Sequence, residues 1–359
     1  MIAPDDIKAA VSSGVLSEAQ AADLTVLAQK RAGARVSASA DDEPFELFRG
    51  LNDVFVTVGI GLLAFAGGLG GELVALADLG PAYQAALFAS YGLLLWAMAE
   101  YFTRKRRMVL PSLMIAGLFT VCLLIAGSLV SLHISGQRVW VAEAAALGAM
   151  VGTTAFYLRF KLPFAIFLTA LSILLAILAV TDVLAPLEQL QDSSLMFNLI
   201  EAPEVALILL AFGLACFAIA LRFDLSDPHR MTRRSACAFW LHLLAAPAIV
   251  NTVALTLYES EGALATLALV LIILLIALIA LVIDRRSLLL AAVAYIGAVM
   301  SLALDGLDGL AGGAVVFLLL GLLITTLGAG WTRLRNSLMR ALPKFPGKDR
   351  LPPYVKAQT

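Results

Sequence analysis

One apolar segment combines a histidine, a proline and an asparagine, and this combination could build a site inside a membrane. His242, Pro247 and Asn251 lie in the stretch RRSACAFWLHLLAAPAIVNTVAL. Pro247 has no N–H, so the carbonyl of Leu243 should lose its helical partner and the helix should kink. A freed carbonyl beside polar side chains is one way in which midplane sites are built. A straight helix would place His242 and Asn251 on opposite faces, so each could instead bond to a neighbouring helix.

Three carboxylates in other apolar segments are further candidates, because a charge inside a membrane is costly and usually functional. Asp53 opens the first apolar segment and predicts either an ion or proton site or a helix N-cap. Glu72 follows the glycine-rich stretch 59–71, which predicts close helix packing or an unwound backbone beside a cation site. Glu143 lies about one turn into a later segment, where it could pair with Arg138.

The sequence contains no motif that would add catalysis or a metal to these candidates. It has no GxxxxGK, HExxH, GxSxG or CxxC pattern. The three cysteines are far apart within apolar segments, and the three histidines cannot meet in the expected topology: Cys122, Cys216, Cys237, His133, His229 and His242. We therefore expect no enzyme activity, no metal and no cofactor. The formal net charge of −1 gives no basic bias toward nucleic acid.

The elements that must position these residues are membrane helices. The chain of 359 residues is 61% hydrophobic and 14% charged, whereas a soluble protein is about 45–50% apolar and about 25% charged. A hydrocarbon core of about 30 Å needs roughly 20 apolar helical residues. About ten segments meet this requirement and predict an all-α polytopic bundle, at 53–77, 82–102, 109–132, 139–158, 162–182, 203–222, 236–258, 262–283, 287–304 and 309–331.

The positive charges alternate along the connections between these segments. Lys and Arg collect at 103–108, 159–161, 222–234, 285–286 and after 332, and Arg138 is the only one in the other connections. Basic residues gather on the cytoplasmic side of bacterial membranes. The pattern therefore predicts a multi-pass protein of a bacterial inner membrane, with both termini in the cytoplasm.

Two polar regions flank the predicted bundle of residues 51–331. Residues 1–50 predict a helical hairpin and linker, with Gly14 ending the first helix and Ser17 and Gln20 forming a capping box at the second. This hairpin is too small to fold around its own core, so we expect it to contact another copy of the chain or a membrane partner. Residues 332–359 form a basic, amphipathic tail that should lie on anionic membrane lipid.

Three stretches resemble an uncharacterised family of predicted bacterial inner-membrane proteins that carry a short helical N-terminal region. They are FELFRGLNDVFVTVG, AEYFTRKRRMVLPS and RRSACAFWLHLLAAPAIVN. The resemblance implies a multi-span helical fold over most of the chain. It implies no activity and no functional residues.

Two hypotheses about function follow. The first is a secondary transporter of a small solute, such as a cation, in which the polar and glycine-rich helices line a path. The second is a non-transport scaffold or accessory protein, in which the polar groups hold the bundle together. The transporter hypothesis expects Glu72, His242 and Asn251 to surround one cavity, and the scaffold hypothesis expects them in separate helix contacts.

Overall fold

The computed structural model is helical throughout the residues that it describes, with no strand among them. These residues are 4–31, 51–135, 140–181, 196–230, 232–260, 262–286, the single positions 288, 293, 296 and 297, and 309–354. The all-α fold expected from the apolar segments is thereby confirmed.

Nine helices of the described chain are long and apolar enough to cross a membrane, so the protein is a multi-pass membrane protein whose outer surface contacts lipid. The predicted span at 287–304 lies largely outside the described residues. The spanning helices are α3 Leu51–Leu76, α4 Pro81–Ala99 with the π-helix η1 Glu100–Lys105, α5 Val109–Ser135, α6 Val141–Phe160, α7 Pro163–Val180, α8 Pro203–Leu225, α9 Arg233–Glu259, α10 Ala263–Ile283 and α12 Gly309–Ala341.

Proline and left-handed residues mark many of the helix boundaries. Pro81, Pro163 and Pro203 each begin a helix, where the missing N–H costs nothing. At the other end, α6 and α10 finish on Lys161 and Asp284, which have left-handed backbones with φ of 53° and 58°. These positions terminate the helices sharply and allow short connections.

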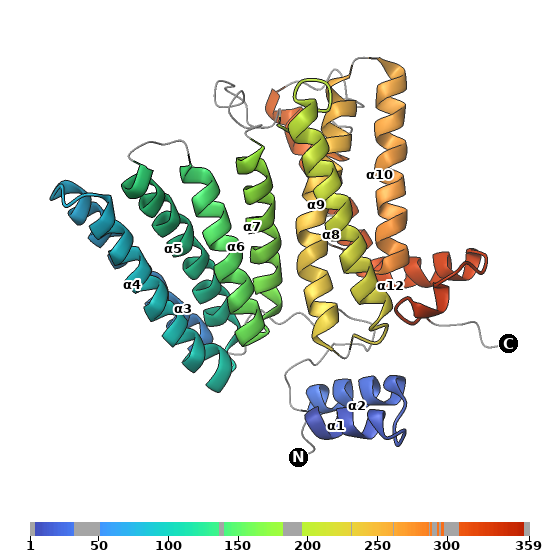
Figure 1. Cartoon of the computed structure of the whole chain (residues 1–359). Helices are drawn as coiled ribbons and strands as arrows, with labels where there is room; N and C mark the ends of the chain where they lie inside the picture. Colours follow the sequence, from blue (N-terminus) through green and yellow to red (C-terminus); the bar gives the residue numbers. More distant parts are fainter. Residues whose placement is uncertain are drawn as a thin grey trace. The chain divides into compact units, whose positions relative to one another are not determined.

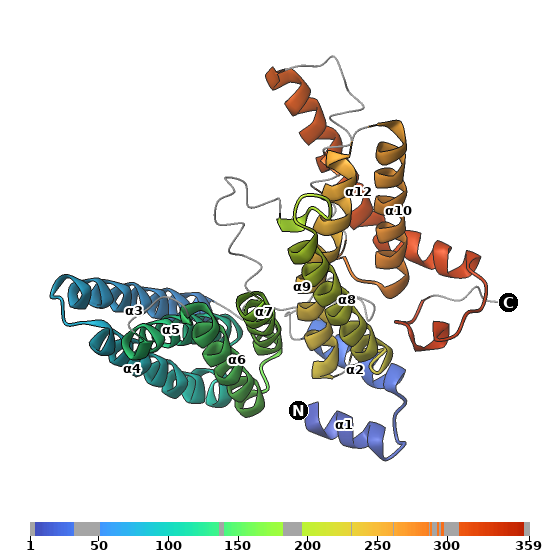
Figure 2. The same cartoon turned by 45° about the horizontal axis from the view of Figure 1, so that its top comes forward.

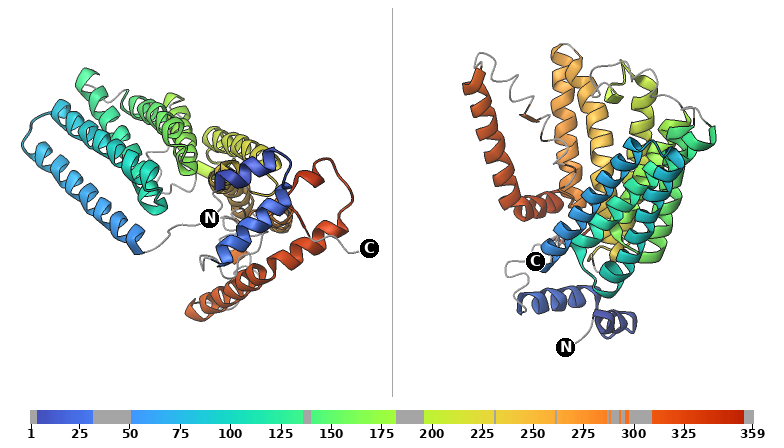
Figure 3. Two further views of the ribbon diagram at one scale, coloured as in Figure 1. Left: turned by 90° about the horizontal axis from the view of Figure 1, so that it is seen from below. Right: turned by 90° about the vertical axis from the view of Figure 1, so that its left-hand side faces the viewer.

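The N-terminal region forms the expected helical hairpin, α1 Pro4–Ser12 and α2 Glu18–Arg31 (Figure 3). The backbone N–H of Gln20 donates to Ser17 Oγ at 3.2 Å, and the N–H of Ser17 donates to Gln20 Oε1 at 3.0 Å. The predicted capping box is therefore confirmed. Gly14 has a φ of 75° in the turn between the helices, as its predicted role as a stop requires.

The chain divides into two compact units. Unit 2 comprises residues 45–212, and in it α4, α5, α6 and α7 follow one another side by side (Figures 1 and 2). Unit 1 comprises residues 1–44 and 213–359, and in it the part of α8 from Gly213 onward, α9 and α10 run alongside one another. The predicted limits at residues 50 and 331 stay predictions; the helix α12 continues through 331 to Ala341.

Unit 2 is held together by aromatic packing and close helix contacts. Trp96 of α4 packs at ring distances of 5.2–5.8 Å against three phenylalanines of α5 and α6: Phe119, Phe156 and Phe160. Gly127 brings α5 against the backbone of α6, since a Cβ there would lie 2.9 Å from the carbonyl oxygen of Ala144. The contacts between α4, α5 and α6 are therefore apolar and close.

Candidate functional site

The histidine of unit 1 is fully buried and binds a carboxylate on the neighbouring helix. His242 Nε2 of α9 lies 2.9 Å from Asp224 Oδ2, near the end of α8. The imidazole ring also contacts the edge of Phe217, with ring centres 5.3 Å apart. This is the helix-to-helix bond that the sequence offered as an alternative to a solute site.

Arg285 completes this site from a third helix end. Its Nε donates to Asp224 Oδ2 at 3.1 Å, and Nη2 donates to Asp224 Oδ1. Nη2 also donates to the carbonyl oxygen of Ser235 at 3.0 Å, in the first turn of α9. The side chain of Arg285 is 1% exposed and that of Asp224 4%, so both charges are buried and neutralise each other. Together they join α8, α9 and the end of α10.

A second buried carboxylate, Asp284, gathers groups from two further segments, the connection after α8 and helix α12. Arg230 Nη2, in the connection after α8, donates to Asp284 Oδ2 at 2.9 Å and to its carbonyl oxygen at 2.8 Å. Trp331 Nε1 of α12 donates to Asp284 Oδ1 at 2.7 Å. Arg335 Nε, one turn further along α12, lies 3.7 Å from the same oxygen. Neighbouring residues 284 and 285 thus hold two adjacent ion-pair centres.

The C-terminal segment is tied to the same end of unit 1. Arg335 donates to the carbonyl oxygens of Pro352 and Pro353 at 2.6 and 3.0 Å. Lys348 Nζ donates to the carbonyl oxygens of Met339 and Leu342, both at 2.6 Å, and so satisfies the free carbonyls at the end of α12. The chain therefore folds back on α12 as far as Tyr354.

This network changes three expectations from the sequence. Arg335 and Lys348 were predicted to face membrane lipid, but both are buried and bind within the protein. An aromatic residue at the end of a span is expected in the interfacial belt, but Trp331, at the end of the predicted span 309–331, is 3% exposed because its N–H binds Asp284. The arginines 230 and 285, counted only as topology signals, are ion-pair partners. The exposed basic residues near the tail are Arg333, Arg340, Lys344 and Arg350.

The network is suited to holding helix ends together and poorly suited to binding a solute. Asp224 accepts from two partners, His242 and Arg285, and Asp284 accepts from Arg230 and from Trp331 of α12. A buried charge that is paired and hydrogen-bonded is satisfied, whereas removing one partner leaves the other buried and unpaired. The arrangement offers a proton-binding histidine and carboxylate, but each of them is bonded to protein.

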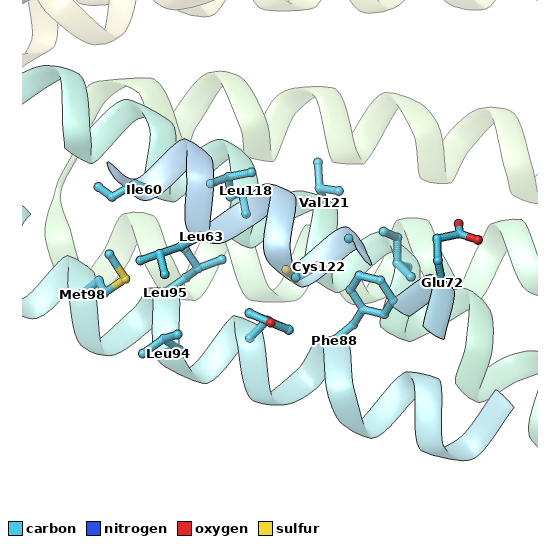
Figure 4. A pocket seen from close by; sticks show the side chains of 15 residues that line it. Ile60, Leu63, Glu72, Phe88, Leu94, Leu95, Met98, Leu118, Val121 and Cys122 are labelled. Carbon is cyan, nitrogen blue, oxygen red and sulfur yellow. The ribbon is translucent and has the colours of Figure 1, made fainter. Parts of the chain in front are cut away.

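Unit 2 contains a mainly apolar cavity of about 290 Å³ between α3, α4 and α5 (Figure 4). Its walls come from leucine, isoleucine, methionine and aromatic side chains, and Glu72 lies at one end (Figure 4). Ligand pockets commonly measure about 300–1,000 Å³ and combine apolar walls with a few polar groups. The cavity is at the small end of that range.

Glycines of α3 shape this cavity by close packing, and α3 stays helical across them. A Cβ at Gly67 would lie 2.9 Å from the Tyr91 ring, and a Cβ at Gly71 would lie 2.9 Å from the Phe88 ring. Both rings belong to α4 and line the cavity. Gly67 and Gly71 thus pack closely, as one interpretation of the glycine-rich stretch expected, whereas Gly59 and Gly68 face open space, and the backbone is helical throughout the stretch.

The predicted site residues do not converge. Asp53 is buried in the first turn of α3, and Glu72 is exposed 19 residues along the same helix, about 28 Å away at 1.5 Å per residue. Glu143 is half-buried in the first turn of α6, and its predicted partner Arg138 lies outside the described residues.

The other three predicted residues belong to unit 1. His242 joins the buried network, whereas Asn251 is half-buried nine residues further along α9 and is not part of it. Helix α9 is continuous from Arg233 to Glu259 across Pro247, and the kink at Pro247 stays a prediction. The cavity that Glu72 lines includes neither His242 nor Asn251, so the arrangement expected of a transporter is not found there.

Sequence reasoning missed Asp224, Asp284, Arg285 and Arg335. A signal for the first two was present, because they are carboxylates at helix ends whose connections are otherwise rich in Lys and Arg. An acid retained among cations predicts an ion pair. The pairing itself could not be read from the sequence, since Asp224 and Arg285 are 61 residues apart.

Comparisons of the chain with protein-family models, with curated proteins and with solved structures find no match. The protein is thus a multi-pass helical membrane protein with no identified family, and the resemblance to a bacterial inner-membrane family stays a prediction.

Proposed function

We propose that the chain is a non-transport membrane scaffold or accessory protein. The supporting observation is that the buried charges of unit 1 bind one another. Asp224 binds His242 and Arg285, and Asp284 binds Arg230. A transporter needs polar groups that can exchange partners with a solute. A scaffold needs polar groups that keep its helices in place.

The N-terminal hairpin is the proposed partner-binding region of this scaffold. Ala21 and Ala22 of α2 are buried, while Val15 is 75% exposed and Leu27 is 53% exposed. Exposed apolar side chains on a small helical element favour contact with another protein or another copy of the chain. The hairpin connects to the membrane helices through residues 32–50.

Site-specific photo-crosslinking in cells tests this proposal. A photoreactive amino acid would be placed at Val15 or Leu27, with the exposed Asp23 of the same hairpin as the control position. We expect discrete crosslinked species from the two apolar positions and little from Asp23. Equal labelling at all three positions, or no crosslinked species from any, would refute the hairpin as a docking element.

Transport of a small cationic solute is the second candidate, and the cavity of unit 2 favours it. Its apolar walls and the single carboxylate Glu72 suit a lipophilic cation. A ligand that binds only the folded state raises the melting temperature. Tetraphenylphosphonium should therefore stabilise the detergent-purified wild type and not the Glu72→Gln variant, with Glu143→Gln as the control. A saturable, Glu72-dependent uptake into proteoliposomes would replace the scaffold proposal with this one.

A further inference from the structure

Two short connections of unit 2 carry a set of exposed cations. Four lie between α4 and α5 and two at the turn between α6 and α7: Arg104, Lys105, Arg106, Arg107, Arg159 and Lys161. All six side chains are exposed, in contrast to the buried arginines of unit 1.

Glu100 joins the two connections into one basic face. Its Oε1 accepts from Arg159 Nε of α6 at 2.6 Å, and its Oε2 accepts from Arg104 Nη1 at 3.2 Å. Glu100 and Arg104 are four residues apart on one helical turn, whereas the bond to Arg159 joins two different helices. One carboxylate bound to two of six cations leaves this face strongly positive.

Aromatic rings place this basic face at the depth of lipid headgroups. Arg106 lies over the ring of Tyr101, 5.7 Å from its centre, and Lys161 lies 5.5 Å from the ring centre of Tyr157. Tyrosines at the ends of membrane helices occupy the interfacial region. The cations they contact are therefore level with the phosphates of the bilayer.

The surface next to the cations is apolar and lipid-facing. Leu158 of α6, next to Arg159, is 59% exposed, and Leu94 of α4, ten residues before Arg104, is 47% exposed and also lines the cavity of unit 2. A hollow beside η1 is lined by Ala97, Glu100, Tyr101, Arg104 and Lys105. A cationic hollow adjoining an apolar helix surface suits a ligand with an anionic head and hydrocarbon chains.

We propose that the basic end of unit 2 is a binding site for the headgroup of an anionic phospholipid. Its phosphate would accept hydrogen bonds from the guanidinium groups, whose planar geometry matches phosphate oxygens. The acyl chains would lie along the exposed leucines. Basic pockets between membrane helices are a recognised way of binding anionic lipid headgroups. The lipid is preferred over a soluble phosphate because the apolar surface continues directly from the cations.

Native mass spectrometry of the detergent-purified full chain tests the site. Phosphatidylglycerol would be compared with phosphatidylcholine of the same acyl chains, for the wild type and the variant Lys105→Gln/Arg106→Gln. The matched control, Arg333→Gln/Arg340→Gln, removes two exposed cations from unit 1. We expect the wild type and the control to prefer phosphatidylglycerol, and the test variant to bind it roughly thirtyfold more weakly, from about 1 kcal/mol per removed cation.

A second measurement needs no variant and is independent of whether the variants fold. Binding of phosphatidylglycerol to the wild type should weaken between low and high salt, because exposed charges are screened. Equal affinity for the two lipids, or affinity that salt leaves unchanged, would overturn the proposal. So would an equal loss in the control variant. Binding of inorganic phosphate as tight as that of the lipid would show a phosphate site without lipid selectivity and would also overturn it.

Discussion

The basic ends of the two units use the same residue types in opposite ways. In unit 1, Arg230 and Arg285 are buried and bind Asp284 and Asp224. In unit 2, the six cations between α4 and α5 and around the α6–α7 turn are exposed around the single carboxylate Glu100. The number of nearby acids accounts for the difference, since a buried cation requires an anionic partner and an exposed one does not.

The left-handed residues repeat this contrast at the level of the backbone. Arg230 and Asp284 both have positive φ and are bonded to each other, so an ion pair holds two strained turns. Arg107 and Lys161 in unit 2 have φ of 53° each and expose their side chains. A glycine would be less strained at each of these turns. The cation at each of these turns must therefore be useful for its charge. In unit 1 the charge of Arg230 binds Asp284, and in unit 2 the charges of Arg107 and Lys161 face the surroundings of the protein.

The largest expected effect is the loss of one partner in the buried pair of unit 1. Asp224→Ala should destabilise the protein by about 3–5 kcal/mol, because Arg285 would be left as a buried and uncompensated charge. Thermal unfolding in detergent measures this loss. Glu100→Gln in unit 2 should change the melting temperature little, since its partners Arg104 and Arg159 are exposed.

A double substitution controls for the shape of the site. Asp224→Leu/Arg285→Met removes both charges, and it should recover much of the lost stability. If the Asp224→Ala and Glu100→Gln variants unfolded at the same temperature, the contrast between the buried ion pairs of unit 1 and the exposed ion pairs of unit 2 would be wrong.

The second effect concerns the C-terminal segment. Arg335→Ala removes two charged hydrogen bonds to the carbonyl oxygens of Pro352 and Pro353, each worth about 1.5 kcal/mol or more. The segment should open more often, and trypsin should cut at Arg350 roughly tenfold faster or more. The exposed Arg333→Ala is the control, and equal cleavage rates in both variants would argue against a tethered tail.

The third effect tests the packing of unit 2, which relies on small residues and aromatic rings. Gly67→Ala should cost about 2 kcal/mol, because its Cβ would lie against the Tyr91 ring. Gly68→Ala, at the next residue of the same helix, has no atom within 4 Å of its Cβ. It should instead gain up to about 1 kcal/mol from better helix propensity. If the melting temperatures of Gly67→Ala and Gly68→Ala both rose or both fell relative to the wild type, the packing described for α3 and α4 would be wrong.

The smallest effect comes from the left-handed turns. Lys161→Gly should relieve backbone strain and stabilise unit 2 by about 0.5–1 kcal/mol. Asp284→Gly relieves similar strain but removes the acceptor of Arg230 and Trp331, so it should destabilise unit 1. Chemical or thermal unfolding should show that Lys161→Gly raises the free energy of unfolding and Asp284→Gly lowers it. Changes of the same sign in both variants would contradict the distinction between these turns.

Local features were predictable from the sequence. The segment expected at 162–182 is α7, Pro163–Val180, because proline and a long apolar run define both ends. The capping box at Ser17 and Gln20 and the pair Glu100–Arg104 follow from spacings of three and four residues. These features depend on neighbours within one helical turn, where the geometry is fixed.

Contacts across the chain were not predictable. Counting Lys and Arg by connection indicates the side of the membrane on which a loop lies, but it carries no information on burial. Arg285 and Arg286 are adjacent, yet the first is buried against Asp224 and the second is exposed, with its guanidinium 5.5 Å from the ring centre of Trp331. Their different environments depend on where α8 and α12 lie in the fold. The hydrophobic periodicity of the sequence does not give the positions of those helices. For the same reason, the sequence could suggest that His242 bonds to a neighbouring helix, but it could not identify Asp224 as the partner.

The separation of Asp224 from Arg285 has a consequence for biosynthesis. Residue 224 leaves the ribosome 61 residues before its arginine partner, a delay of roughly 3–12 s at translation rates of about 5–20 residues per second. His242 follows Asp224 after only 18 residues and is the first partner to be made. The helices α8 and α9 therefore enter the membrane with an incompletely neutralised carboxylate, and synthesis of α10 ends this interval. A stall in translation between residues 242 and 285 would prolong it and give quality-control proteases a substrate.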